Sequence, residues 1–412
     1  MRLPTHEATT AQLGAVYPLV ASRPLPSGGV LVGRDLLGGS FVHDPFELYG
    51  AGALTNPNMI VLGQIGRGKS ALVKSYLYRQ AAFGRRIVVL DPKGEYGPLA
   101  AALGTVPIAL RPGGRVRLNP LEVRTTRAGC DDAARRRLAL CSAIAASALG
   151  RPLVPVEHTA VEIALDAASA GGAQPTLPAV VEALLFPLAD AARRVGSDAA
   201  ELRSASRDLA LELRRLVHGE LRGMFDGPTS PGLALGGAAV VLDLAAVYHS
   251  PALGVLVACA TASVLAAVEA DTTARTVLVV DEAWAVLANL GVARFLQSSW
   301  KLARARGIAN LAVVHRVSDL AAVGDADSAA TRLAQGLIAD SETVVCYAQP
   351  ASELPGLAAA LGLSDEEVRI VAALRRGVAL WRVGGRSYLV EHRLAPGESH
   401  LVDTDARLVG AS

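Results

Sequence analysis

Short apolar runs recur along the chain, and most are followed by a polar or glycine-rich segment and then by residues with helical periodicity. Near-continuous apolar runs are typical of strands that are buried on both faces, with the intervening helices as covering layers. The pattern therefore predicts an α/β fold with a mostly parallel central sheet. The runs predicted as strands of this sheet are Met59–Gly63, Arg86–Asp91, Ala239–Leu244, Thr276–Asp281, Asn310–His315 and Thr343–Tyr347.

Weaker patterns lie around this core. Short candidate strands are Val30–Gly33, Ser40–His43, Val106–Leu110 and Val116–Leu118. The C-terminal part carries two helical patterns, Ser352–Leu361 and Asp365–Leu374, and then an alternating stretch that turns at Gly384-Gly385. Two glycines between alternating runs predict a β-hairpin.

Between about residues 125 and 223 the strand patterns disappear, and amphipathic stretches rich in Ala, Leu and Arg alternate with glycine and proline breaks. This length, roughly 100 residues, corresponds to one small domain, so we expect an all-helical insertion domain. The expected division is an N-terminal extension with short strands over 1–55, a core domain over 56–124 and 224–395, the insertion over 125–223, and a C-terminal tail over 396–412.

One uncharged stretch, Ala252–Val268, raises the question of a membrane span. Its 17 residues are few for a span, are often small, and lack basic flanks, so we expect a buried helix and no membrane span. The N-terminus lacks an apolar signal core, and the four cysteines are scattered without a CxxC pair. These features favour a reducing cytoplasmic location over a disulfide framework or a metal site.

Composition narrows the class of protein. Of the 412 residues, 51% are hydrophobic and 19% are charged, which excludes a disordered chain. The formal net charge of +2 argues against a sequence-independent nucleic-acid coat. Lys and Arg total 40, yet only four are lysines, Lys69, Lys74, Lys93 and Lys301. Where Arg nearly always replaces Lys, each remaining Lys marks a position for chemistry that Arg does not supply.

A glycine-rich loop follows the first core strand. Residues 63–70, GQIGRGKS, match G-x-x-x-x-G-K-[ST] between an apolar strand and a predicted helix over Lys69–Phe83. The glycines let successive N–H groups point at a phosphate at the positive end of the helix dipole. We expect Lys69 to bridge the β- and γ-phosphates and Ser70 to offer its hydroxyl to Mg²⁺. For the side chain of Arg67 we favour a position facing solvent, with a contact to phosphate as the alternative. The residues expected to contact the nucleotide are Gly63, Gln64, Ile65, Gly66, Arg67, Gly68, Lys69, Ser70 and Ala71.

A later strand supplies the acidic partners of this loop. Asp281 and Glu282 follow the apolar run Thr276–Val280, at the strand end where ligands of open α/β sheets bind. We expect Asp281 to hold the metal and Glu282 to polarise the attacking water as general base. For this acidic pair alone, capping of the next helix is the alternative.

Two further strand ends carry polar residues. In the segment DPKGEY, Asp91 and Glu95 are candidates for organising metal or water, and Lys93 for pairing with them or with phosphate. An ordinary polar turn is the alternative for this segment. His315 follows another strand and is a candidate γ-phosphate sensor, with a capped or solvated histidine as the alternative.

The segment KLARARG closes the helix after the acidic pair. Arg304 and Arg306 are candidate arginine fingers that reach the γ-phosphate of a neighbouring subunit. Stabilisation of a helix C-terminus by basic side chains is the alternative.

Six features follow one another along the chain: GQIGRGKS, DPKGEY, LNPLE, VVDEAW, KLARARG and the C-terminal hairpin. Together they resemble the assembly ATPases of type IV secretion and conjugation systems, over roughly residues 30–395. These are the TraC-like, VirB-type members of the HerA/FtsK superfamily of P-loop proteins. The resemblance implies a RecA-like nucleotide-binding core with an all-α insertion, and Mg-ATP hydrolysis between the subunits of a homo-hexameric ring. It also implies partners among the secretion and conjugation components at the inner membrane, a protein or DNA substrate, and a peripheral location at the cytoplasmic face of the cell membrane.

By position, Lys69 and Ser70 match the P-loop residues of that family, and Asp281 and Glu282 match its magnesium acid and catalytic glutamate. Arg304 and Arg306 match its basic motif. The sequence departs from the family where it has His315 in place of the common glutamine. The family commonly has a large N-terminal domain, and here about 30–55 residues precede the P-loop.

Two other functions remain open at this point. A DNA translocase of the same superfamily, or a conjugative coupling ATPase, is compatible with the run Arg135-Arg136-Arg137. The neighbouring Asp131-Asp132, however, indicates an ordinary solvated helix face. A nucleotide-dependent scaffold with low turnover is the other alternative, and the intact Asp281-Glu282 pair argues against it.

Overall fold

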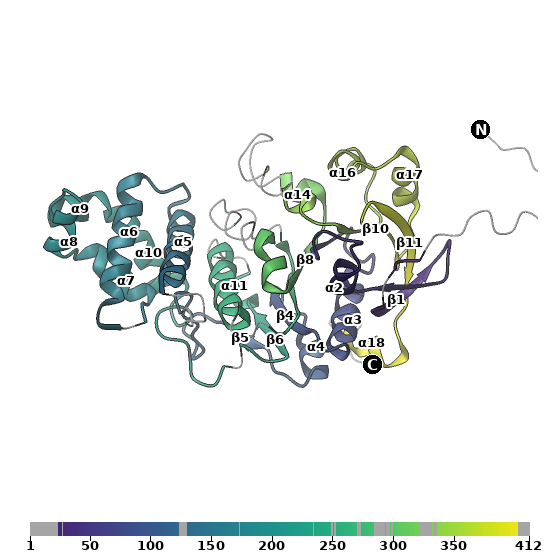
Figure 1. The fold of residues 1–412 in the computed structure, drawn as a ribbon, viewed down its shortest axis with the longest axis horizontal. Helices are drawn as coiled ribbons and strands as arrows, with labels where there is room; N and C mark the ends of the chain where they lie inside the picture. Colours follow the sequence, from purple (N-terminus) through teal and green to yellow (C-terminus); the bar gives the residue numbers. More distant parts are fainter. Residues whose placement is uncertain are drawn as a thin grey trace, which may run out of the picture.

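The fold is organised around one eleven-stranded sheet, whose strand order in this computed structural model is β2-β1-β11-β10-β9-β3-β8-β7-β4-β6-β5 (Figure 1). The structure describes residues 24–26, 28–122, 130–172, 174–233, 235–248, 250, 253–269, 273–283, 293, 297, 300–321, 332 and 336–402.

Seven neighbouring strands of this sheet are parallel, from β9 through β5. They are β9 (Thr343–Cys346), β3 (Met59–Leu62), β8 (Ile308–Val314), β7 (Thr276–Val280), β4 (Arg86–Asp91), β6 (Ala239–Asp243) and β5 (Ile108–Ala109). Every residue of β3, β4, β7, β8 and β9 is buried, as expected for strands covered on both faces. The prediction of a mostly parallel sheet with helices is therefore confirmed.

The remaining four strands are antiparallel and extend the same sheet. They are β10 (Val378–Val383), β11 (Arg386–His392), β1 (Val30–Asp35) and β2 (Ser40–His43). The hairpin forms as predicted, with Val383 opposite Arg386 across the two glycines. The N-terminal strands join the C-terminal hairpin, because β1 pairs with β11. At this pairing a Cβ on Gly33 would lie only 2.0 Å from the carbonyl oxygen of Glu391.

One strand prediction is wrong. Val116–Leu118 forms no strand, and β5 is reduced to Ile108–Ala109. The segment instead lies along residues 224–230, where Leu118 N donates to Met224 O at 2.8 Å. Arg117 N donates to the hydroxyl of Ser230 at 2.9 Å. Side-chain acceptors interrupt the backbone ladder there, so no regular strand develops.

Helices cover the two faces of the sheet (Figure 1). Alternate strand residues divide between two apolar clusters: Ile60 and Leu62 face the cluster that contains α11 (Leu253–Glu269), whereas Val61 faces the cluster that contains α3 (Lys69–Ala82). Helix α11 begins at Leu253, within the uncharged stretch discussed above, and its residues Val255–Ala260 are buried, as predicted. In the part of the chain that the structure describes, no helix has the length and hydrophobicity needed to cross a membrane.

The expected helical segment contains helices and no strand within its described residues. These are α5 (Cys130–Leu149), α6 (Pro155–Ala168), η1 (Ala170–Gly172), α7 (Leu177–Leu185), α8 (Ala189–Arg194), α9 (Ala199–Ala205), α10 (Arg207–Arg215) and η2 (Leu216–Glu220). Figure 1 shows them gathered at one end of the molecule, with α5 next to α11.

Shorter helices complete the fold. They are α2 (Pro45–Gly50), α4 (Gly97–Ala102), η3 (Ala245–Val247), η4 (Arg304–Arg306), α14 (Val317–Ala321), α16 (Leu354–Leu361), α17 (Asp365–Ala373), η5 (Pro396–Glu398) and α18 (Ser399–Val402). Helix α18 packs on α3, where Arg79 forms a forked ion pair with the buried carboxylate of Glu398.

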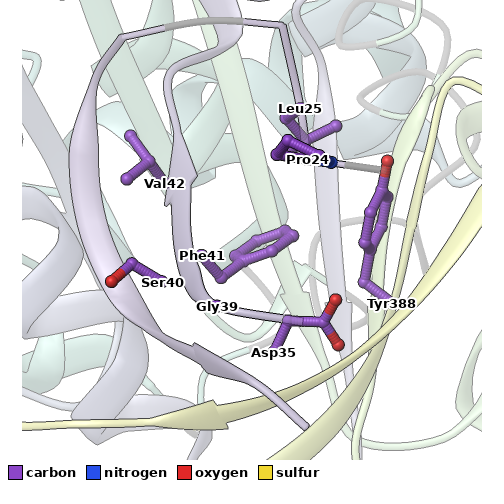
Figure 2. Close-up of a pocket in the computed structure, with 8 residues that line it drawn as sticks. All are labelled: Pro24, Leu25, Asp35, Gly39, Ser40, Phe41, Val42 and Tyr388. Carbon is purple, nitrogen blue, oxygen red and sulfur yellow. The ribbon is translucent and has the colours of Figure 1, made fainter. Parts of the chain in front are cut away.

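A cavity of about 350 Å³ lies beside the β1–β2 hairpin, with the rings of Phe41 and Tyr388 on one side and Pro24 and Leu25 above them (Figure 2). Three strands of the sheet, β11, β10 and β9, lie between β1 and β3. This cavity is therefore distinct from the glycine-rich loop that follows β3.

Candidate active site

The glycine-rich loop lies between the end of β3 and the start of α3, as predicted. Gly63 N donates to His315 O at 3.2 Å, and Gln64 N donates to Ala348 O at 3.3 Å. Gly66 and Gly68 have φ values of 79° and 111°. Only glycine adopts such conformations without strain, so the sequence pattern fixes the path of the loop.

Gly63 has a second reason to be glycine. Its φ is 155°, and a Cβ at this position would lie 2.4 Å from the Cβ of Tyr347, which follows β9. The neighbouring strand end therefore sets how closely the loop approaches the sheet. Among the side chains of the loop, Ile65 is 79% exposed, and the partly exposed Arg67 donates to Gln64 Oε1 at 3.3 Å.

Lys69 is the first residue of α3, and its side chain is buried. Its Nζ donates to the carbonyl oxygen of Gly63 and, at 3.0 Å, to that of Gln64. Burial lowers the pKa of Lys69 to about 8, against the opposing effect of the Glu282 and Asp281 charges. The ammonium group thus bonds to two carbonyl oxygens of the loop and lies where it can also bind a phosphate.

Four parallel strands bring the predicted polar residues to one edge of the sheet. Leu62 pairs with Val314 at the end of β8, and Val280 pairs with Leu90 near the end of β4. The four strands are neighbours in the order β3, β8, β7, β4. Their ends therefore place side by side the glycine-rich loop after β3, His315 after β8, Asp281 after β7, and the Asp91–Tyr96 loop after β4.

Asp281 is buried at the end of β7, with 7% of its surface exposed. Its Oδ1 accepts from Glu282 N at 2.9 Å, and its Oδ2 accepts from the hydroxyl of Tyr96 at 3.0 Å. Burial and then the adjacent Glu282 charge raise the pKa of Asp281 to about 6. Ser70 is half-buried in the first turn of α3. A buried carboxylate and a hydroxyl are the hard oxygen donors that suit Mg²⁺.

Glu282 is only 3% exposed and has a φ of +50°, a left-handed conformation that is uncommon for a non-glycine residue. Its Oε1 lies 2.5 Å from Lys93 Nζ and 2.9 Å from His315 Nε2. Burial acts to lower the pKa of Lys93, but the hydrogen bond and charge of Glu282 raise it overall. The carboxylate predicted to act as a base is thus already paired.

His315 contacts the loop as well as the acid. Its carbonyl oxygen accepts from Gly63 N, and also from Gln349 Nε2 at 3.0 Å. Gln349 is 5% exposed and follows β9 on the other side of β3. The structure therefore brings His315 to Glu282, while Gln349 supports it from the next strand end.

The DPKGEY segment forms a fastened loop. Asp91 accepts hydrogen bonds from the backbone N–H groups of Lys93, Gly94 and Tyr96, at 3.2, 2.8 and 2.9 Å. Its oxygens thus hold the loop, which is the role expected of an acid in a polar turn. The half-buried Glu95 interacts electrostatically with Lys74: burial lowers the pKa of Lys74, and the Glu95 charge opposes this shift.

Arg304 and Arg306 do not lie near this edge of the sheet. They form η4, which precedes β8, whereas His315 follows β8. The seven residues of β8 span about 20 Å, so the two arginines lie toward the opposite edge of the sheet. The exposed Arg304 donates to Thr55 O at 3.5 Å, ahead of β3.

Three contacts of the site did not follow from the sequence. The hydroxyl of Tyr96 binds Asp281, Gln349 supports His315, and Lys93 pairs with Glu282. The sequence left Lys93 open between carboxylates and phosphate. Tyr96 had a weak signal, because it ends the same polar turn that carries Lys93.

Comparisons with known proteins identify the fold. No family model matches the chain, and no curated protein matches it in sequence. Among solved structures, VirB4 of Thermoanaerobacter pseudethanolicus matches with a TM-score of 0.76 and 23% identity, over 92% of this chain and 100% of that one.

The plasmid coupling protein TrwB matches with lower scores. Its complex with the non-hydrolysable ATP analogue ADPNP has a TM-score of 0.58 and 17% identity, over 94% of this chain and 93% of that one. Its complex with ADP and Mg²⁺ has a TM-score of 0.56 and 17% identity, over 84% and 87% of the two chains. The predicted resemblance is therefore confirmed at the level of the fold: the chain has the RecA-like fold of VirB4 and of the conjugative coupling protein TrwB.

Proposed function

We propose that this chain is an Mg²⁺-dependent ATPase, working as a homo-hexamer, that energises assembly or substrate transfer in a type IV secretion or conjugative transfer system. One observation carries the proposal: a glycine-rich phosphate loop and a buried Asp-Glu pair meet at one sheet edge of a fold that matches VirB4 over 92% of the chain. The higher TM-score with VirB4 than with TrwB favours the assembly ATPase over the coupling protein.

The residues of the site fit ATP and Mg²⁺. The fit rests on Lys69, whose buried ammonium group donates to carbonyl oxygens of its own loop. Phosphate oxygens are stronger acceptors than these carbonyl oxygens, so a bound phosphate would replace them as partners of the ammonium group. Ser70 and Asp281 would hold Mg²⁺, which supplies charge neutralisation for the phosphates. The TrwB complexes with ADP and Mg²⁺ and with ADPNP support this assignment.

The chemistry of this chain is positioning and proton transfer. Gly63 N and Gln64 N already donate to carbonyl oxygens of neighbouring strand ends, so the backbone N–H groups from Ile65 to Ala71 bind phosphate at the N-terminus of α3. Lys69 exchanges its carbonyl partners for phosphate oxygens. Glu282 accepts the proton of the attacking water as the bond from the water oxygen to the γ-phosphorus forms. The bond from that phosphorus to the β–γ bridging oxygen breaks, and ADP leaves with the bridging oxygen. His315, bound to Glu282 at 2.9 Å, holds the carboxylate in place.

The subunit seam supplies the remaining residues. Arg304 and Arg306 lie toward the edge of the sheet opposite to the loop, so either acts as an arginine finger only on the site of a neighbouring subunit. A hexameric ring satisfies this requirement. The ring would work peripherally at the cytoplasmic face of the cell membrane, with secretion or conjugation components as partners and a protein or DNA as substrate.

ATP hydrolysis at several protein concentrations, with and without DNA, tests the proposal. We expect Mg²⁺-dependent turnover that rises with concentration as rings form, and a loss of at least about 100-fold in Glu282→Gln, the usual range for a removed general base. Glu366→Gln, an exposed acid on α17, is the control and should keep full activity. Unchanged hydrolysis in Glu282→Gln would remove the proposed mechanism. Turnover stimulated by DNA and falling steeply with salt would favour a translocase instead.

A further inference from the structure

The contact between Lys93 and Glu282 is the closest ion pair of the site. The two atoms, Lys93 Nζ and Glu282 Oε1, are 2.5 Å apart, and the side chains are 28% and 4% exposed. A pair this sheltered is weakly screened by solvent, so it holds its partners far more firmly than a surface pair does. Lys93 therefore restrains the carboxylate that the proposed function uses as a base.

The lysine is presented by a preformed loop. Asp91 accepts from three N–H groups of this loop, including that of Lys93. Gly94 has a φ of 72°, and a Cβ there would lie 3.3 Å from the Cβ of Ala245. The loop backbone is thus held by its hydrogen bonds to Asp91 and by its close packing against Ala245. Lys93 changes partners by rotating its side chain, with no rearrangement of the sheet edge.

The paired carboxylate is not ready to act. The Oε1 atom of Glu282 contacts both Lys93 Nζ and His315 Nε2, and the backbone of Glu282 has a left-handed conformation. A carboxylate in contact with an ammonium is stabilised as the anion, so it is a weaker proton acceptor while the contact lasts. Release of Lys93 would leave His315 in contact with this oxygen.

The other lysine of the site lies in the same field. The charges of Glu282, Asp281 and Lys93 all act on the pKa of Lys69. The two ammonium groups and the two acids therefore belong to one electrostatic cluster. A terminal phosphate bound beside Lys69 brings further negative charge into this cluster. Phosphate oxygens compete well with a carboxylate for an ammonium group.

We propose that Lys93 is a γ-phosphate-dependent latch on Glu282: it holds the base in the nucleotide-free and ADP-bound states and transfers to the terminal phosphate when ATP binds. The inference rests on the proposed ATPase function and adds to it a rule for when the base is released. Lys93 is a positioning residue in this scheme, since it acts through Glu282. ADP lacks the third phosphate, so the pair with Glu282 persists in its presence.

Calorimetric titration of the full chain with Mg²⁺ and either ADPNP or ADP tests the latch. Lys93→Met should weaken ADPNP binding about tenfold and leave ADP binding unchanged, because only the terminal phosphate gains the lysine. Lys93→Arg keeps the charge and should restore the ratio of the two dissociation constants. Arg369→Met, which breaks an exposed pair of the same 2.5 Å separation with Glu366, is the matched control and should change neither constant.

Glu282→Gln tests the same exchange from the other side and remains informative should Lys93→Met fail to fold. It frees the lysine in advance, so ADPNP should bind several-fold tighter than to the wild type, again without a change for ADP. A purely structural lysine predicts equal weakening of both nucleotides in Lys93→Met. Equal weakening of ADPNP and ADP binding, or no change in either, would leave the ratio of the two dissociation constants unchanged and would overturn the latch. Failure of Lys93→Arg to restore the wild-type ratio would also overturn it. Wild-type protein that binds neither nucleotide would instead refute the proposed function itself.

Discussion

The buried His43 makes the stability of the fold depend on pH in a way that a single substitution can isolate. His43 ends β2 and is fully buried, and its ring contacts the hydroxyl of Tyr76 on α3 at 2.9 Å and that of Thr343 on β9 at 3.3 Å. It therefore joins the N-terminal strands to the helix that carries the phosphate loop. Burial lowers the pKa of His43 from 6.5 to about 3, because the charged ring has no water around it.

The sign and size of the effect follow from this shift. A folded pKa below the unfolded value means that the unfolded chain takes up the proton first, so stability is lost as pH falls below 6.5. Between pH 7 and pH 5 the loss from His43 amounts to about 2 kcal/mol. That is a large part of a typical total stability of about 5–15 kcal/mol. Asp281 acts in the opposite direction, because its raised pKa favours the folded state in acid.

Because these effects partly cancel, the measurement compares His43→Gln with the wild type. Urea unfolding followed by tryptophan fluorescence, in the presence of EDTA, gives both free energies at pH 7 and at pH 5. Whatever His43→Gln costs at pH 7, its difference from the wild type should shrink by about 2 kcal/mol at pH 5. His158→Gln, at an exposed position of α6, should run parallel to the wild type throughout. A His43→Gln curve that also runs parallel to the wild type would refute the reasoning.

Two further substitutions test the packing around α3. Gly63→Ala should destabilise the fold by about 2 kcal/mol and abolish nucleotide binding, because its Cβ would lie 2.4 Å from that of Tyr347. Gly50→Ala, in open space at the end of α2, is the control that should change neither urea midpoint nor binding. Arg79→Met should cost about 3 kcal/mol in urea unfolding, because it leaves the buried carboxylate of Glu398 without its partner. Equal stability of Arg79→Met and wild type would show that this ion pair does not hold the segment of η5 on α3.

The parallel core was predictable because its signals are local. Each of its main strands is a continuous apolar run. The loop before Lys69 has glycines at a spacing that few other structures require. Asp281 and Glu282 were placed correctly for the same reason, since a buried strand ends directly before them. Their roles remain predictions that the proposed assays address.

What the sequence did not reveal depends on contacts between distant segments. Strand β1 was expected, but its place against β11 depends on the close approach of Gly33 to Glu391, 358 residues later. Asp91 was grouped with the metal-organising residues because strand ends converge, yet its oxygens are already used by backbone donors of its own loop. The partner of a polar side chain depends on loop geometry, which residue type alone does not encode.

The scarcity of lysine in the chain acquires a physical reason in the site. Lys69, Lys74 and Lys93, three of its four lysines, all interact electrostatically with the acids at the end of β7. Asp281 and Glu282 are adjacent, buried and of like charge, so compact cations must lie close by to keep them ionised. A guanidinium group is larger and forks in a plane, whereas an ammonium group changes acceptors by rotating a flexible stem. Arginine at Lys93 would keep the charge, but lysine balances these acids before ATP binds and transfers to phosphate afterwards with the smaller rearrangement.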